Sequence, residues 1–465
     1  MPYTIRVITP IALLRKLAAA SHCYYLLESV EGGEKWGRYS FLGYDPTIRF
    51  TCKNSHIQID QNGETKLLDK TNPYEAIRTL LQEYTSPRFT DLPPFTGGFV
   101  GYFSYESLCY AEPKLQLQPS DTHDMELMLF DKIIAFDHLK QKIFLIVNMK
   151  SADGEDGLRA AYQAIDRMSA LILDSSPLPV ETAPEQVHFS CNVSREQYYN
   201  MVKKAKAYIR QGDIFQAVLS RKFEAPYSAS LLNAYRVLRT TNPSPYMYFL
   251  HSDDIEITGT SPETLVKLKD GTLTTYPIAG SRPRGTTEEE DRALEKELLH
   301  DEKELSEHNM LVDLARNDLG KISAFGSVAV KDYAKINRFS RIMHITSTVE
   351  SQIRAPFDAC DTIAAMLPAG TLSGAPKIRA CEIINELEPS ARGIYGGAIG
   401  YIDFSGNMDT CITIRTAVKR GGTVTVQAGG GIVADSVPER EYIESENKAL
   451  AVKLAIESAS EVNPK

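Results

Sequence analysis

The hydrophobic and polar residues of this chain form short β-like runs and longer helical periods. Apolar side chains that alternate with polar ones predict strands, and apolar side chains three and four positions apart predict helices. This pattern predicts strands at Tyr24–Ser29, Ile48–Cys52, Gly97–Ser104, Lys132–Asp137, Lys142–Met149 and Asp213–Phe223. It predicts helices at Tyr74–Tyr84, Gly157–Leu173, Ser194–Gln211 and Ser228–Thr240.

The last third of the chain has the most regular strand pattern. Gly396–Phe404 and Asp409–Lys419 are β-like runs joined by a Ser-Gly-Asn turn signal, and a Gly-Gly turn leads from the second run to Thr423–Ala428. Consecutive hairpins imply antiparallel pairing, and the helices interleave less regularly than in a βαβ array. The pattern therefore predicts an α+β fold, in which antiparallel β-sheets are packed together and covered by helices.

Length and composition predict more than one hydrophobic core. The chain has 465 residues, of which 43% are hydrophobic and 24% are charged, as in ordinary globular proteins. Asp174–Gln186 contains three prolines and no apolar period, which predicts a linker. We therefore divide the chain into an N-terminal part, residues 1–180, and a C-terminal part, residues 187–465.

Charge and cysteine content argue against several classes of function. The net charge of −9 gives no electrostatic support for binding to nucleic acid or to an anionic membrane. The sequence has no apolar run of roughly 20 residues, the length that crosses a membrane, and no signal-peptide pattern. None of its 7 cysteines forms a C-x-x-C motif, which favours reduced thiols in a cytoplasmic protein.

Paired glutamates mark the stretch that follows the glycines Gly429–Gly431. Pro438 suits the first turn of a helix, in which Glu441 and Glu444 share one face and Lys448 lies a turn beyond Glu444. Two like charges on one helix face cost a few tenths of a kcal/mol, and a bound cation would reverse that cost. A solvated acidic helix explains the same pattern without a ligand.

A second helical stretch, Asp301–Gly320, repeats this arrangement with Glu304 and Glu307. Two helices that each offer paired glutamates predict one oxygen-rich site for a hard divalent cation. Mg²⁺ binds a few carboxylates together with waters and substrate oxygens. Because no HExxH spacing surrounds His308, we predict Mg²⁺ rather than zinc.

Two further positions offer groups for catalysis. Glu263 follows a Pro-containing turn and is a general acid if its pocket is dry enough to raise its pKa; a charge at a helix N-terminus is the alternative. In Leu367–Lys377, the Thr371 hydroxyl and backbone amides can hydrogen-bond a ligand carboxylate. A helix N-cap at Thr371 or Ser373 is equally consistent with the sequence.

Arginines offer groups for anion binding. Arg415 lies in the predicted strand Asp409–Lys419, on one face with Cys411, and needs a carboxylate partner from a ligand or from the protein. The rigid loop Tyr276–Gly285 carries two more arginines. His344, among apolar residues, is interpreted as a satisfied core histidine. A substrate with two carboxylates explains these signals jointly, since one would bind Mg²⁺ and the other would meet Arg415 and the glycine amides.

Four long motifs, in this order, resemble the chorismate-utilising enzymes. They are PIAGSRPRG (Pro277–Gly285), DEKELSEHNMLVDLARND (Asp301–Asp318), LPAGTLSGAPKIRA (Leu367–Ala380) and GGGIVADSVPEREYIESENKA (Gly429–Ala449). The resemblance is strongest over Ser190–Ser458 and implies the chorismate-binding enzyme fold. It also implies a Mg²⁺-dependent lyase that converts chorismate and ammonia to anthranilate and pyruvate, the first committed step of tryptophan biosynthesis.

The resemblance implies a role for each matched residue. Glu263 would be the acid that assists departure of the hydroxyl group, and His344 and Thr371 complete the catalytic set. The implied Mg²⁺ ligands are Glu304, Glu307, Glu441 and Glu444. The residues implied to bind the substrate are Gly280, Tyr395, Arg415, Gly429, Gly431 and Lys448.

Two positions distinguish the reactions within this family. Relatives that add water carry a lysine at the position of Gln216, and relatives that aminate C4 for the folate pathway carry one at the position of Ala279. Neither lysine is present here, so the resemblance favours amination at C2. The aminodeoxychorismate-forming component is the nearest alternative.

Two motifs resemble the site at which L-tryptophan acts as a feedback inhibitor in this family. They are LLES (Leu26–Ser29), near the N-terminus, and NPSPYMYF (Asn242–Phe249), in the middle of the chain. They imply that the N-terminal part is regulatory. The residues implied at this site are Leu27, Glu28, Ser29, Pro245, Tyr246, Met247, Tyr401 and Cys411. A domain interface explains the same motifs without regulation, and the intact glutamate pairs argue against a non-catalytic tryptophan-binding protein.

The source of ammonia is expected to lie outside this chain. No cysteine is in a G-x-C-x-G nucleophile turn, so the sequence offers no glutaminase of its own. Ammonia is then either free or delivered from glutamine by a separate glutamine amidotransferase subunit, component II.

Overall fold

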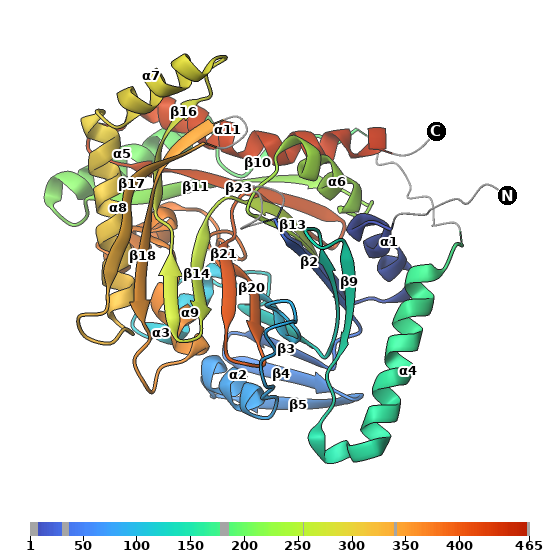
Figure 1. Ribbon diagram of the computed structural model, residues 1–465. Coiled ribbons are helices and arrows are strands. Elements are labelled where there is room, and N and C mark those ends of the chain that lie inside the picture. The colour runs from blue at the N-terminus through green and yellow to red at the C-terminus, as the bar shows by residue number, and fades with distance from the viewer. Residues whose placement is uncertain (1–7, 30–36, 177–185, 254, 339–341, 463–465) are drawn as a thin grey trace.

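Two large antiparallel sheets form the centre of the structure, a computed structural model that describes residues 8–29, 37–176, 186–253, 255–338 and 342–462 (Figure 1). The first sheet has the order β10 (Ser190–Cys191), β11 (Gln216–Pro226), β23 (Thr423–Ile432), β22 (Thr416–Arg420), β13 (Ile255–Ser261), β12 (Tyr246–Ser252), β1 (Tyr24–Glu28), β2 (Tyr39–Tyr44), β8 (Lys132–Asp137) and β9 (Lys142–Val147), with β19 (Gly374–Ala375) paired to β11. The second has the order β16 (Ile278–Pro283), β18 (Ile342–Gln352), β15 (Thr272–Thr275), β14 (Thr264–Lys269), β21 (Met408–Ile412), β20 (Ala398–Asp403), β6 (Gly98–Phe103), β7 (Met125–Phe130), β3 (Ile48–Lys53), β4 (His56–Gln61) and β5 (Glu64–Asp69), with β17 (Ala329–Arg338) paired to β18.

Helices cover the outer faces of both sheets. The first sheet packs against α1 (Pro10–Ala20), α4 (Gly154–Leu173), α5 (Arg195–Gln211), α6 (Leu232–Thr241), α10 (Lys377–Leu387) and α11 (Pro438–Glu457). The second packs against α2 (Pro73–Gln82), α7 (Glu288–Leu298), α8 (Glu302–Gly320) and α9 (Ala359–Met366). Shorter helical elements are α3 (Leu108–Ala111) and 3₁₀ turns at Tyr105–Ser107, Ser151–Asp153, Gly370–Leu372 and Ser458–Val462. Within the described ranges, no helix is both long and apolar enough to cross a membrane.

A further core fills the space between the two sheets. Tyr25, Phe41 and Tyr248 of the first sheet meet Val100 and Phe130 of the second, and the rings of Tyr25 and Phe130 are 4.7 Å apart in an edge-to-face arrangement. Strands such as β6 and β7 are buried on both faces, which explains why they are continuous apolar runs rather than alternating ones. The layer order helix–sheet–sheet–helix confirms the predicted α+β fold.

Both sheets contain strands from each side of the predicted linker. β1 pairs with β12 in the first sheet, and β6 pairs with β20 in the second. The linker itself, predicted at Asp174–Gln186, falls largely on residues 177–185, outside the described residues. The division into residues 1–180 and 187–465 therefore concerns function, and it stays a prediction.

Local signals place most of the predicted helices and strands within a few residues. Ser194 and Gln197 form a capping box at the start of α5, and Gly212 ends this helix in the left-handed conformation, with φ 85°. Pro438 occupies the first turn of α11, as predicted. The strand predicted from Asp213 begins three residues later, because the turn that follows Gly212 comes first.

The predicted strand Asp409–Lys419 is wrong as a single element. β21 ends at Ile412 in the second sheet, and β22 begins at Thr416 in the first. The chain crosses between the sheets in the intervening residues, where Arg415 has a φ of 50°. The assignment of Arg415 and Cys411 to one strand face therefore does not hold.

Truncation of a leucine in β1 should destabilise the whole fold. Leu26 is fully buried among residues of both chain parts, so Leu26→Ala is expected to lower the free energy of unfolding by about 2–5 kcal/mol. The matched control is Leu67→Ala, since this leucine is 69% exposed and should change stability by less than about 0.5 kcal/mol. Urea unfolding followed by circular dichroism measures both, and equal effects would contradict the packing described here.

Candidate active site

Glu263 lies where the chain crosses from β13 in the first sheet to β14 in the second. Its carboxylate Oε1 accepts a 2.9 Å hydrogen bond from the Thr371 hydroxyl, and its carbonyl accepts one of 3.0 Å from the Ile412 amide. The alternative of a helix N-terminal charge is thus wrong, because Glu263 connects two strands. Thr371, in the 3₁₀ turn Gly370–Leu372, caps no helix either, since its hydroxyl is donated to Glu263.

Burial raises the pKa of Glu263 to about 7. The Thr371 hydrogen bond and the charges of Lys448 and Arg415 act in the opposite direction, because each favours the carboxylate. A carboxyl group with a pKa near neutral pH is suited to give and regain a proton in each turnover. The raised pKa is the property expected of a general acid at this position.

Arg415 lies in the second crossing, between β21 and β22. Its charge lowers the pKa of both Glu263 and His344, which places it beside these two residues. A left-handed backbone is unfavourable for an L-residue with a long side chain, and such conformations concentrate at functional sites. The crossing, rather than a strand face, brings the guanidinium group to the acid.

His344, in β18, closes another side of the site. Its Nδ1 lies 3.0 Å from the carbonyl oxygen of Gly280 in β16, and burial lowers the pKa of the ring. A bulge in the β16–β18 pairing at Ala279–Ser281 gives Gly280 a φ of 68°, and a Cβ there would lie 3.1 Å from Glu304 Oε2. The left-handed backbone conformation therefore favours glycine, and the Glu304 side chain of α8 would have to shift slightly to admit a Cβ.

The three glycines Gly429–Gly431 belong to β23 and not to a loop. A Cβ on Gly429 would lie 2.4 Å from the Leu219 carbonyl oxygen, and one on Gly431 would lie 2.3 Å from Nε2 of Gln216. The Gly429 amide also hydrogen-bonds the hydroxyl of Tyr395, whose pKa is raised by burial. The glycines thus allow close packing on this strand, and Gly429 lies beside Tyr395, which is also implied to bind the substrate.

The four predicted metal ligands come from α8 and α11. Burial and the nearby charges of Glu304 and Glu444 raise the pKa of Glu307, and burial and Glu444 raise that of Glu441. Like charges from two helices therefore act on one another, as a shared cation site requires. Cations are already close, since Lys448 Nζ lies 2.7 Å from Glu444 Oε1.

The carboxylate arrangement fits Mg²⁺ only if other ligands complete the shell. In the part of the chain that the structure describes, no three His, Cys, Asp or Glu side chains gather closely enough to bind one ion. Mg²⁺ usually retains waters and takes substrate oxygens beside one or two carboxylates. A bound Mg²⁺ would relieve the repulsion between carboxylates at Glu307 and Glu441, so these residues fit a magnesium ion.

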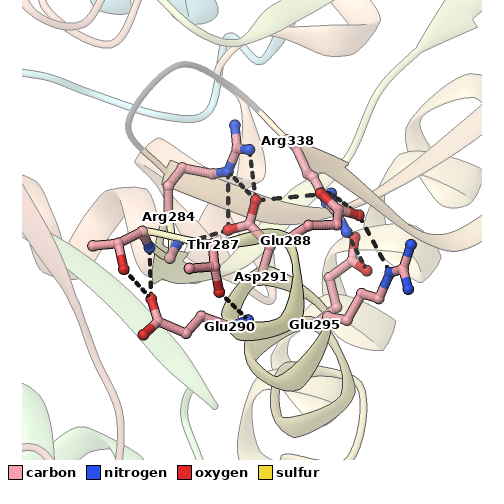
Figure 2. Close-up of polar contacts among 10 residues, drawn as sticks. Arg284, Thr287, Glu288, Glu290, Asp291, Glu295 and Arg338 are labelled. Carbon is pink, nitrogen blue, oxygen red and sulfur yellow. Dashed lines mark hydrogen bonds and ion pairs between the residues drawn. The ribbon is translucent and has the colours of Figure 1, made fainter.

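Helix α7 is joined to the ends of β16 and β17 by ion pairs (Figure 2). Arg284, directly after β16, donates to the buried carboxylate of Asp291, with Nη2 2.6 Å from Oδ2. Arg338, the last residue of β17, pairs with Glu288 and Glu295 at 2.8 and 2.9 Å. This network fixes the end of the strand that carries Gly280.

The segment Tyr276–Gly285, predicted as a rigid loop, is mostly strand β16, and its arginines pair with carboxylates of the protein and not with an anionic ligand. Besides the Arg284–Asp291 pair, Arg282 pairs with Glu297 and Asp301 at 3.0 and 2.8 Å. Sequence reasoning missed this network. The acidic run that follows the loop, Glu288–Asp291, is the signal that indicates it.

The residues implied in tryptophan binding lie in or beside β1 and β12 of the first sheet and in β20 and β21 of the second. Leu27, Tyr246, Tyr401 and Cys411 face the core between the sheets. Glu28 and Met247 face the outer core instead. There the Glu28 carboxylate accepts hydrogen bonds from Arg239 (2.7 Å) and Tyr235 of α6. Ser29 is half-buried directly after β1, and Pro245 directly precedes β12.

Comparison with known proteins identifies the family. The sequence model of a protein family, described as "chorismate binding enzyme", matches residues 23–453. The chain therefore belongs to the chorismate binding enzyme family. Its curated relatives include anthranilate synthase component 1 of Acetivibrio thermocellus, 46% identical over 98% of this chain and 94% of that protein. The protein of the same name from Aquifex aeolicus is 45% identical over 97% of this chain and 93% of its own length.

Solved structures agree with this assignment. Anthranilate synthase component I from Streptococcus pneumoniae superposes with a TM-score of 0.78 and 34% identity, over 97% of this chain and all of that chain (100%). The menaquinone-specific isochorismate synthase MenF of Escherichia coli has a TM-score of 0.73 at 18% identity, over 97% of this chain and 92% of its own. The second likeness shows the shared fold alone.

Replacement of Glu263 by glutamine should change how stability depends on pH. Because folding raises this pKa from 4.5 to about 7, protonated Glu263 stabilises the folded state at low pH, and that contribution is lost as the pH rises through 7. The difference in the free energy of unfolding between Glu263→Gln and the wild type should therefore shift by roughly 3 kcal/mol in favour of the variant between about pH 4 and pH 8. The test is to measure the free energy of unfolding of the wild type, of Glu263→Gln and of the exposed control Glu439→Gln across this pH range. If the wild type and Glu263→Gln show the same dependence on pH, Glu263 is not a buried acid.

Proposed function

We propose that this chain converts chorismate and ammonia to anthranilate and pyruvate in a Mg²⁺-dependent reaction, the first committed step of tryptophan biosynthesis. The observation that carries the proposal is the position of Glu263, a buried carboxyl with a pKa of about 7 between Thr371, Arg415 and Lys448. The high identity to relatives named anthranilate synthase component 1 supports the same reaction.

The residues of the site account for the chemistry of each step. Ammonia bonds to C2 of the ring while the C4–O bond breaks, and the new ammonio group loses one proton to solvent. Glu263 gives its proton to the hydroxyl, which leaves as water. Loss of the C2 proton and of the enolpyruvyl group, which takes up a proton, then yields anthranilate and pyruvate. Arg415, Lys448 and the glycine amides hold the substrate's carboxylates in register with the acid.

Mg²⁺, held by Glu304, Glu307, Glu441 and Glu444, would screen and orient a substrate carboxylate. The charge repulsion between α8 and α11 supports this assignment. Without a bound cation, the same carboxylates would repel chorismate, because chorismate is a dianion. Metal and substrate should therefore bind cooperatively.

The residues that face the ring favour amination at C2. Ala279 is buried beside Gly280, and Gln216 is buried against Gly431. Neither offers an amine that could attack the ring or activate water, so ammonia has access to C2. The aminodeoxychorismate-forming component is the alternative, and its product distinguishes it.

We also propose a partner that supplies the ammonia. The relatives' name, component 1, implies a second component, and none of the cysteines of this chain is in a nucleophile turn. A glutamine amidotransferase subunit in the cytoplasm would deliver ammonia to the catalytic part, residues 187–465. L-Tryptophan would act as a feedback inhibitor at Leu27, Ser29, Tyr246, Tyr401 and Cys411, between the sheets, with residues 1–180 as the regulatory part.

Purified protein should form anthranilate from chorismate, Mg²⁺ and ammonium, identified by mass spectrometry. EDTA or Glu444→Gln should reduce turnover by at least about a hundredfold, because either change removes a cation or its ligand. Glu439→Gln, on the exposed side of the same helix, should have no effect, and glutamine should replace ammonium only when the partner is added. Formation of 4-amino-4-deoxychorismate, or full activity in EDTA, would contradict the proposal.

L-Tryptophan should inhibit this reaction, and Ser29→Ala should raise the concentration needed for half-inhibition by about tenfold without lowering the uninhibited rate. Ser29 directly follows β1, two residues after Leu27, which packs against the core between the sheets, and it is not one of the catalytic residues. Ser55→Ala, in an exposed turn, is the control. Calorimetry that detects no tryptophan binding to the wild type would contradict this prediction.

A further inference from the structure

A cavity of about 50 Å³ connects Glu263 and Thr371 with Asp318 of α8. Its other walls include Tyr276, Leu314 and Ala315. One water molecule needs roughly 10–15 Å³ of such volume, so the cavity has room for about three waters. Carboxylates at two of its walls provide the polar partners that keep water in place.

Asp318 joins this cavity to a cluster of lysines. The residue is only 3% exposed, and its Oδ2 accepts a 2.7 Å hydrogen bond from the buried Lys377 ammonium. Its Oδ1 accepts one of 3.1 Å from Lys321, whose side chain is 45% exposed. The cluster therefore lies beside the cavity and reaches solvent at Lys321, on the same face of α8 as Glu307 and about three turns further along the helix.

A purely structural role does not explain this cluster well. Removing two or three charges from water is costly, and an apolar substitution of similar volume is often neutral or stabilising. Lys377 and Asp318 come from two of the motifs that mark the family, yet neither touches the residues implied to bind the substrate or Mg²⁺. Their one link to the chemistry is the cavity that ends at the acid.

The acid needs a route for protons. If Glu263 gives its proton to the leaving hydroxyl, it must regain one before the next turnover. The charges of Arg415 and Lys448 act on Glu263 from the side where the proposed function places the substrate, which would block that side to water. On the other side it faces the cavity, where Asp318 and Tyr276 are the titratable groups.

We propose that water in this cavity returns a proton to Glu263 from the Asp318–Lys321 edge, and that Asp318 is a positioning residue for that water. The inference rests on the proposed function, because it assigns Glu263 as the acid. A solvent proton binds the cavity water at Asp318 while the water at Glu263 releases a proton to the carboxylate. One O–H bond forms on Glu263, one proton leaves solvent, and no water is consumed.

Filling the cavity tests the relay without breaking the ion pair. Ala315→Leu places a larger side chain in the cavity, and Ala315→Ser at the same position is the matched control. Because proton return follows the chemistry, Ala315→Leu should lower kcat by roughly ten- to a hundredfold and leave kcat/KM for chorismate unchanged. The first turnover should stay fast, so a burst of anthranilate appears, and the solvent deuterium isotope effect on kcat should rise.

A second variant addresses the positioning role directly. Asp318→Asn combined with Lys377→Met removes the carboxylate without leaving a buried ammonium unpaired, and should give the same burst and isotope effect. An equal fall in kcat and kcat/KM in these variants, or no burst and an unchanged isotope effect, would overturn the relay. Absence of anthranilate from the wild type would instead overturn the proposed function, so the two failures are distinguishable.

Discussion

The site depends on two neighbouring segments that change sheets side by side. β13 is paired with β22 in the first sheet, and β14 is paired with β21 in the second, so the two connections cross the gap in opposite directions next to each other. Backbone that leaves a sheet loses its ladder partners and must find others. Here the Ile412 amide donates to the Glu263 carbonyl, and the Ser261 hydroxyl donates to the Ile412 carbonyl at 2.7 Å. Each crossing thus holds the other, and each contributes one charged side chain to the site.

This arrangement also sets the electrostatics. Glu263 and Arg415 lie between two apolar layers, where burial raises the free energy of any charge that is not compensated. The acid is compensated only in part, by a hydroxyl and by two cations, so its pKa stays near neutral. On the opposite side of the substrate space, α8 and α11 bring carboxylates together whose repulsion raises two further pKa values. Lys448 acts on both groups of carboxyls, since its charge favours the carboxylate of Glu263 and its ammonium pairs with Glu444.

The sequence predicted those parts of the site that depend on local spacing. The glutamate pairs of α8 and α11 follow from positions three apart on a helix, and the four motifs identified the family. The Thr371–Glu263 hydrogen bond spans 108 residues and has no local signal. The run Asp409–Lys419 is β-like on both sides of the crossing, and a local pattern cannot tell that its halves join different sheets. Ile255–Ser261 (β13) was not predicted because its buried serine and threonines resemble a surface segment, although hydrogen bonds satisfy them.

The strand order has a consequence for how the chain acquires its structure during synthesis. In the first sheet, β22 and β23 lie between β11 and β13, although they are the last strands of the chain to be made. A ribosome releases the other strands well before these two, so the edges of β11 and β13 wait without partners. Unpaired edges of this kind invite pairing with other chains. The first sheet therefore cannot close until β22 and β23 have been synthesised, and the nascent chain is open to chaperones until that moment.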